Sequence, residues 1–163
     1  KCSTMPIFYH FKSIGEIEVA VIERAWKMLL EREAEVVTGD RWVDQAIGYS
    51  RFAIAEKNLF HCIQDSRHME TLLEMRLKHW EYLSSQLEDY GPLEGVDPEV
   101  ARKIRFTRAM TSHGIGTWIS YGWSQMMSDD DEMVRFIQLA SKAILKGIPE
   151  FYEEFHITRT KDK

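Results

Sequence analysis

The sequence has little of what marks several large classes of protein. Its two cysteines are too few for a disulfide framework. It contains no run of 18 apolar residues, so we expect no membrane-spanning helix. No secretory signal peptide, internal repeat or low-complexity tract is visible. A reducing cytoplasm is therefore the default location that we expect.

Signatures of catalysis are also missing. There is no His-Glu-x-x-His, Cys-x-x-Cys or Gly-x-Ser-x-Gly motif and no phosphate-binding glycine loop. The Gly-Ile-Gly sequence at 114–116 lacks the third glycine of a dinucleotide loop and falls inside an expected helix. A di-metal helical bundle needs two Glu-x-x-His motifs, and only Glu153 to His156 fits that spacing. We expect no enzyme, no metal and no cofactor; a helical-bundle enzyme remains an alternative, which metal analysis would test.

What is present suits a compact globular chain. Hydrophobic residues make up 44% of the sequence and charged residues 29%, which are ordinary values for a folded domain. A length of 163 residues is enough to bury one good core. The formal net charge of −5 indicates that the body of the protein does not itself bind nucleic acid.

Apolar residues recur at helical spacing along most of the chain, and turn or capping residues interrupt them. The clearest interruption is the loop at 91–96, which Asp97 follows as an N-cap with Pro98 at the first helical position. The pattern predicts an all-α chain with five or six body helices. The expected helices cover residues 13–37, 41–64, 67–90 and 97–123, and a last helix runs from an acidic cap at 128–131 to a bend or end at Gly147 and Pro149.

The fourth of these helices is rich in small residues. Ser112, Gly116 and Ser120 recur every four positions, beside Gly114 and Gly122. Glycine inside a helix costs about 1 kcal/mol relative to alanine, so a packing reason is expected. We predict that another helix approaches this stripe closely.

The N-terminal stretch, residues 2–17, is the most informative part of the chain. A short helix is expected at 5–11, because Pro6 is tolerated in a first helical turn. Ser13 and Glu16 match the capping box of a long helix that follows at once. Two helices therefore abut with almost no linker. The simpler alternative is a terminal turn packed on a helical bundle.

The pattern S-x-x-x-[IL]-[YF]-x-H-F-x-S, which this chain carries from Ser3 to Ser13, resembles the end of the DNA-binding motif of the tetracycline-repressor (TetR) family. In that family this segment is the recognition helix of a helix-turn-helix and enters the major groove. The resemblance implies that the first of these residues face bases and the later ones lie near phosphates. The implied DNA-binding residues are Thr4, Met5, Pro6, Phe8, Tyr9, His10 and Lys12.

Two residues depart from the family pattern. Phe8 stands where a tyrosine is usual, and Ile14 stands where a lysine is usual, so a hydroxyl group and a charge that would contact phosphate are missing. The first two helices of the motif are also absent from this sequence. We therefore expect the sequence to be a fragment of a longer protein, and only the full-length protein to bind operator DNA.

The C-terminal helices resemble the same family. His113-Gly114, an apolar stretch, an acidic cap and a last helix are similar to its C-terminal half, where the last two long helices of each protomer form a four-helix bundle across a two-fold axis. The resemblance implies a homodimer. An ordinary intramolecular core is the alternative. The apolar residues that suit a dimer contact are Trp118, Ile119, Tyr121, Trp123, Phe136, Leu139 and Ala143.

Polar residues that interrupt apolar helix faces are candidates for a ligand site. Arg76 and Arg108 interrupt two such faces, where an unpaired guanidinium is costly. An anionic ligand such as a carboxylate would pair with one or both; an internal carboxylate, or escape of the side chain to solvent, is the alternative. The aromatic residues nearby favour a flat or hydrophobic effector, although such residues and His113 more often belong to the core. The candidate effector-binding residues are Phe52, Phe60, Arg76, Trp80, Arg108, Met110, His113 and Trp118.

These features predict a ligand-responsive DNA-binding transcriptional regulator of the TetR type, a repressor released from its operator by a small-molecule effector. The alternative is a dimeric helical small-molecule-binding or adaptor protein without operator binding. We expect residues 1–13 to be the end of the helix-turn-helix and 14–37 a connecting helix that acts as a lever. Residues 38–155 would form the effector-binding and dimerisation domain, and 156–163 a frayed tail.

Overall fold

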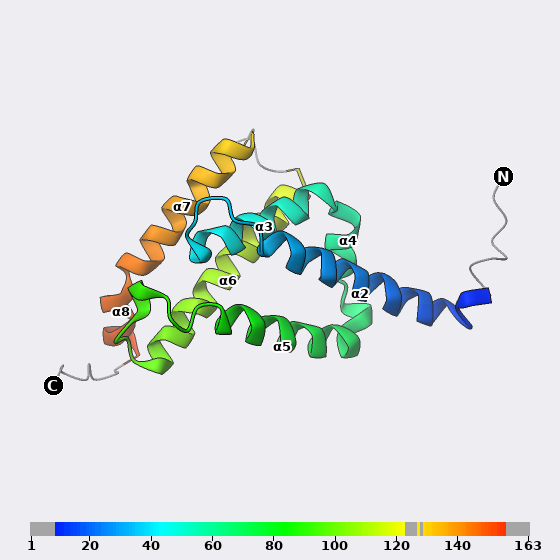
Figure 1. Cartoon of the computed structure of the whole chain (residues 1–163), viewed down its shortest axis with the longest axis horizontal. Coiled ribbons are helices and arrows are strands. Elements are labelled where there is room, and N and C mark those ends of the chain that lie inside the picture. The colour runs from blue at the N-terminus through cyan, green and yellow to red at the C-terminus, as the bar shows by residue number, and fades with distance from the viewer. Residues whose placement is uncertain (1–8, 123–126, 128, 156–163) are drawn as a thin grey trace.

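The computed structural model describes residues 9–122, 127 and 129–155. Within these residues all regular structure is helical and no strand occurs, so the all-α prediction is confirmed (Figure 1). The elements are α2 (Ile14–Glu33), α3 (Arg41–Ala55), α4 (Lys57–Cys62), α5 (Met69–Ser85), α6 (Pro98–Ser120), α7 (Asp130–Lys146) and α8 (Ile148–Glu154), with 3₁₀ turns η1 (Ser66–His68) and η2 (Gly91–Leu93).

The central element is α3, which packs against α2 and against α6 (Figure 1). Residues 42–48 of α3 are all buried, because neighbouring helices cover this segment from several sides. Two apolar clusters meet on α3. The cluster shared with α6 and α7 includes Trp42, Ile47, Ile104, Met133 and Ile137. The cluster shared with α2, α4 and α5 includes Ile22, Leu29, Phe52, Phe60 and Leu72.

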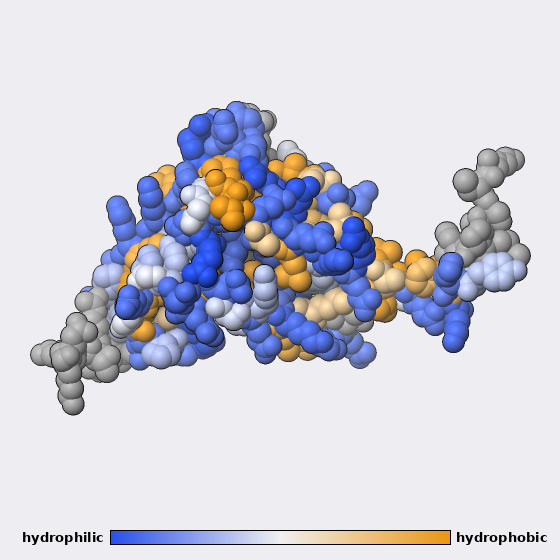
Figure 2. All heavy atoms as spheres, viewed as in Figure 1, coloured by the Kyte–Doolittle hydropathy of each residue, from blue (hydrophilic) through white to orange (hydrophobic). Residues whose placement is uncertain are grey.

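Helix α2 begins at the predicted capping residues. The Ser13 hydroxyl accepts a hydrogen bond from the Glu16 N–H at 3.2 Å, and the Glu16 carboxylate accepts one from the Lys12 N–H at 2.8 Å. The buried residues of α2 all lie between Ile22 and its C-terminal end. Its N-terminal part projects beyond the body and carries apolar residues on its surface (Figures 1 and 2). Ile14 there is 66% exposed.

Helix α2 ends at Glu33, four residues before the expected end. The cause is Asp44, a buried carboxylate on α3 that accepts hydrogen bonds from the Thr38 N–H and hydroxyl and from the Gly39 N–H. These bonds hold the connecting chain in a turn, and Gly39 adopts a φ of 81° there. The Asp40 carboxylate then caps α3 by accepting a hydrogen bond from the Trp42 N–H.

Two other boundaries differ from the expected ones. The helix expected at 41–64 is broken at Glu56, whose backbone is not helical (φ −120°, ψ 46°). The break turns α4 so that the Phe60 ring packs on the rings of Tyr49 and Phe52. The helix expected at 67–90 starts with the turn η1 and becomes α-helical only at Met69, where α5 begins. It ends at Ser85, because the chain beyond it turns to stack Tyr90 on the Trp42 ring of α3.

The small-residue stripe of α6 faces α3, as predicted. A Cβ added to Gly116 would stand 2.9 Å from Cε1 of Tyr49, whereas Gly114 has open space around it. The predicted bend at Gly147 separates α7 from α8. None of the described helices combines the length and the apolar character that crossing a membrane requires.

Candidate functional site

A cavity of about 370 Å³ lies where α2, α3, α5 and α6 surround a gap in the packing. Its volume is near the lower end of the roughly 300–1,000 Å³ that small-molecule sites occupy. The lining residues are Trp26 and Glu33 of α2, Gln45 and Tyr49 of α3, Gln64 after α4, Arg76, His79, Trp80 and Leu83 of α5, and Arg108, Ala109, Met110, Ser112 and His113 of α6.

The cavity brings together most of the candidate effector-binding residues: Arg76, Trp80, Arg108, Met110 and His113. The other three lie elsewhere. Phe52 is fully buried in the apolar cluster of α2 to α5. Phe60 belongs to that cluster and borders a separate hollow. Trp118 is 56% exposed on α6.

Arg108 and Glu33 are the two buried charged residues of the cavity, each with 5% of its surface exposed. Arg108 Nε donates a hydrogen bond to the Trp42 carbonyl at 2.8 Å, and the guanidinium carbon lies 5.1 Å from the centre of the Trp42 ring. Burial lowers the pKa of Arg108 to about 10, while the charge of Glu33 partly opposes this effect. Arg108 is therefore still a cation at neutral pH.

Arg76 belongs to a chain of hydrogen bonds along one wall of the cavity. Its Nη2 donates to the Ile63 carbonyl at 3.3 Å and to Gln64 Oε1 at 3.1 Å. Gln64 Nε2 in turn donates to the Tyr49 hydroxyl, which lies 2.8 Å from His113 Nδ1. Arg76 therefore has neutral oxygen partners. In the described part of the chain neither Arg76 nor Arg108 forms an ion pair with an internal carboxylate.

Glu33 is the acidic residue of the cavity, and the sequence interpretation missed it. Its carboxylate lies 2.5 Å from His79 Nε2, and this contact joins α2 to α5. The Trp26 ring packs beside the same histidine, with ring centres 4.9 Å apart. Glu33 lies one turn after Leu29 on the buried face of α2. The pattern that identified the arginines, a charge interrupting an apolar stripe, would have identified Glu33 too.

Two further lining residues carry unpaired polar atoms. Trp26 Nε1 and Gln45 Oε1 are buried and have no hydrogen-bond partner among the residues whose placement is described. Buried polar atoms are usually paired, so such atoms beside a cavity are candidates for ligand contacts. Neither residue was among the candidates from sequence.

We expect the fold to be more stable when His113 is neutral than when it is protonated. Gln64 donates to the Tyr49 hydroxyl, which leaves the Tyr49 proton to bond an unprotonated His113 Nδ1. Burial, and secondarily the charge of Arg76, lower the pKa of His113 below its usual value. The unfolded chain therefore binds more protons than the folded chain as pH falls through the ordinary histidine pKa of about 6.5.

We therefore predict that acidification destabilises the wild type more than a His113→Gln variant, whose amide oxygen can still accept from Tyr49. The measurement is the free energy of unfolding in urea at pH 7 and at pH 5 for both proteins. The wild type should lose more of this free energy between the two pH values. Equal losses would show that the titration of His113 is not linked to folding.

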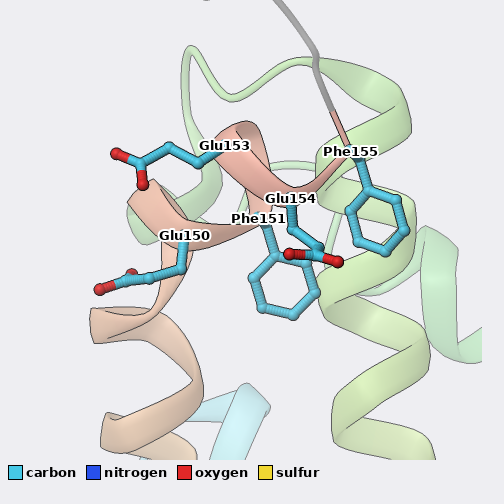
Figure 3. Close-up of a pocket in the computed structure, with 5 residues that line it drawn as sticks. All are labelled: Glu150, Phe151, Glu153, Glu154 and Phe155. Atoms are coloured by element: carbon cyan, nitrogen blue, oxygen red, sulfur yellow. The ribbon is translucent and has the colours of Figure 1, made fainter.

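A second hollow lies at the C-terminal end of the fold. It is lined by α8 and the residue after it, and Figure 3 shows the carboxylates of Glu150 and Glu153 pointing away from the rings of Phe151 and Phe155. Glu150, Glu153 and Glu154 are all exposed. This hollow therefore has no buried polar group that would orient a ligand.

The implied DNA contacts lie at or beyond the edge of the described structure. Thr4, Met5, Pro6 and Phe8 fall outside the described residues. Tyr9, His10 and Lys12 are exposed to solvent, and the first two of these are helical. They lie immediately before α2 (Figure 1).

Comparisons with protein families, with curated proteins and with solved structures found no significant match to this chain. Its function must therefore be inferred from its own residues and geometry. A search of the described residues found no group of three or more His, Cys, Asp or Glu side chains that could hold a metal ion.

Proposed function

We propose that this chain is the sensor of a cytoplasmic, ligand-responsive transcriptional regulator of the TetR type, without catalytic activity. In this proposal the protein represses transcription until a small-molecule effector enters the cavity. The observation that carries the proposal is the position of α2. This helix lines the cavity with Trp26 and Glu33, and at Ser13 it joins the segment that resembles a recognition helix.

The proposed mechanism treats α2 as a lever. Trp26 lies thirteen positions after Ser13 along the helix, which corresponds to about 20 Å. A ligand that displaces Trp26, or the Glu33–His79 pair, would tilt α2 and move its projecting end. Two recognition helices in a dimer must match successive major grooves, so a small change in their separation lowers operator affinity. The effector then acts by shifting the population towards the tilted form.

The proposal includes a homodimer formed through α6 and α7. Exposed apolar residues on these helices support it, because large apolar patches on a surface mark interaction sites. Trp118 is 56% exposed, Phe136 42% and Leu139 66%. Residues 123–126 and 128, between the two helices, lie outside the described structure.

We expect Leu139→Asp to convert the dimer to a monomer, because a buried unpaired carboxylate at the interface is costly. Sedimentation equilibrium at micromolar concentration measures the change. Leu73→Asp is the matched control, since Leu73 is 55% exposed on α5, outside the proposed interface, and this variant should remain dimeric. A wild type that sediments as a monomer would refute the dimer.

Operator binding is the test of the regulator itself. The full-length protein, with its complete helix-turn-helix, is used to select duplexes from random DNA, and the selected sequences are checked by mobility shift. We expect a palindromic sequence with two half-sites, bound more weakly when an effector is added. Failure to enrich any sequence would reject the proposal.

Ile14 favours a second candidate, a dimeric helical binding or adaptor protein that no longer contacts an operator. This residue is 66% exposed at the start of α2, where the TetR pattern has a phosphate-pairing lysine. The DNA selection separates the two candidates, because the adaptor would bind small molecules and enrich no sequence.

A further inference from the structure

We propose that the cavity binds a small aromatic monoanion, such as a carboxylate, and that Arg108 rather than Arg76 holds the anionic group. This deepens, and rests on, the proposed role of the cavity as the effector site. The sequence offered both arginines equally. The structure distinguishes them by their partners.

Arg108 has bonding capacity that the protein does not use. Its Nε is bonded to the Trp42 carbonyl, but its Nη1 and Nη2 groups have no hydrogen-bond or ion-pair partner in the part of the chain that is described. The side chain is 5% exposed and lines the cavity. A carboxylate can accept two parallel N–H···O bonds from such a guanidinium. A ligand anion would therefore neutralise a buried charge that is otherwise costly.

Trp42 fixes the orientation of this guanidinium. The Trp42 carbonyl oxygen accepts a hydrogen bond from Arg108 Nε, and the Trp42 ring centre lies 5.1 Å from the guanidinium carbon. Tyr90 stacks on the Trp42 ring, with ring centres 5.6 Å apart and an interplanar angle of 8°. Arg108 is thus held in place before a ligand arrives, which lowers the entropic cost of binding.

Arg76 is a weaker anchor because its Nη2 group already donates to the Ile63 carbonyl and to Gln64, and both edges of a guanidinium that can hold a carboxylate by two bonds include Nη2. Recruiting Nη2 of Arg76 to an anion would cost the bond that links Arg76 to Gln64, which is the first in the series that continues through Tyr49 to His113. Its charge still contributes a long-range attraction for an anion. We therefore expect Arg76 to affect affinity modestly and selectivity little.

The charges of the lining favour a single negative charge on the ligand. Two arginines and Glu33 give a formal charge of +1 when the histidines are neutral. One oxygen of the Glu33 carboxylate, Oε2, is already paired with His79 Nε2. A ligand with one negative charge would bring the formal charge of the lining to zero, whereas a cationic ligand would be repelled by the two arginines.

The remaining walls favour a flat apolar body. Trp26, Tyr49 and Trp80 supply aromatic surfaces, and Leu83 and Met110 supply aliphatic ones. Aromatic side chains pack well against the faces and edges of other rings. A volume of about 370 Å³ accommodates one or two fused rings with a carboxylate.

The test compares two probes of the same shape, 2-naphthoate and the neutral 2-naphthamide, by isothermal titration calorimetry at pH 7 on the full chain. We expect the carboxylate to bind roughly ten- to hundredfold more tightly, as a charge-assisted hydrogen-bonded pair provides. In Arg108→Met this preference should fall to about onefold while the amide still binds. Arg76→Met is the matched control and should keep most of the preference.

Equal affinity of the wild type for both probes, or no binding of either, would overturn the proposal. So would a preference that persists in Arg108→Met or disappears in Arg76→Met. If Arg108→Met does not fold, Arg108→Lys replaces it and should lose part of the preference, because it keeps the charge but not the fork. The calorimetric assay contains no DNA, so it tests the anion site independently of the regulator. If the probes bind selectively but do not change operator affinity in a separate DNA-binding experiment, the regulator is refuted and the assignment of Arg108 stands.

Discussion

Replacing Gly48 with alanine is expected to lower the free energy of unfolding by about 3 kcal/mol or more, a very large effect for one methyl group. The added Cβ would stand 2.2 Å from the Arg32 carbonyl oxygen and 2.6 Å from Glu33 Cα. Both are backbone atoms, so no side-chain rotation can make room, and α2 must move away from α3. The gain of about 1 kcal/mol that alanine brings to a helix offsets only part of this cost.

The same substitution should disturb the cavity. Glu33 lines it and bonds His79, so displacing the end of α2 would weaken the link between α2 and α5. Urea unfolding followed by circular dichroism measures the stability. Gly114→Ala is the control, because nothing lies within 4 Å of its added methyl group, and it should stabilise the protein by up to about 1 kcal/mol. A loss below about 1 kcal/mol in Gly48→Ala would show that the two helices are not held at this distance.

Replacing Trp26 with alanine is expected to uncouple effector binding from operator binding in the full-length protein. Trp26 is 8% exposed, lines the cavity and packs against His79, so it transmits any displacement by a ligand to α2. Removing the indole leaves a gap into which a ligand can settle without moving the helix. Coupling between sites typically amounts to about 5- to 150-fold in affinity, and most of it should be lost.

The measurement is the ratio of operator affinities without and with a saturating aromatic carboxylate. In the variant this ratio should approach one, while each affinity taken alone changes less. Trp→Ala changes in a core cost about 3–5 kcal/mol, so the comparison is made at a temperature where circular dichroism shows the variant folded. Trp26→Phe keeps an aromatic ring and should retain most of the response. An unchanged ratio in Trp26→Ala would reject the lever role of α2.

The starts of α2, α3, α6 and α7 could be predicted from sequence because capping depends on residues a few positions apart. Ser13 and Asp129 accept hydrogen bonds from the N–H groups of Glu16 and Glu132, and Asp97 caps α6 with Pro98 behind it. Such patterns need no knowledge of the rest of the chain. The helical fold class followed from them and from the apolar spacing.

Helix ends were less predictable because distant residues decided them. The end of α2 depends on Asp44 of the following helix, and the end of α5 on the stacking of Tyr90 against Trp42. The break at Glu56 has no glycine or proline to announce it. The close approach at Gly48 was missed for the same reason, since only the crossing of α2 over α3 gives that glycine its role.

The sequence alone determined the candidate charges of the site, since Arg76 and Arg108 interrupt apolar helix faces, and that pattern is local. Only the tertiary structure decided which of the two arginines keeps both terminal nitrogens available for an anion. Gln64 and Ile63 reach Arg76 from another element, while Trp42, 66 positions away along the chain, reaches Arg108 and leaves its two terminal nitrogens unused. Hydrogen-bond partners are set by the packing of whole helices, and no spacing within one helix contains that information.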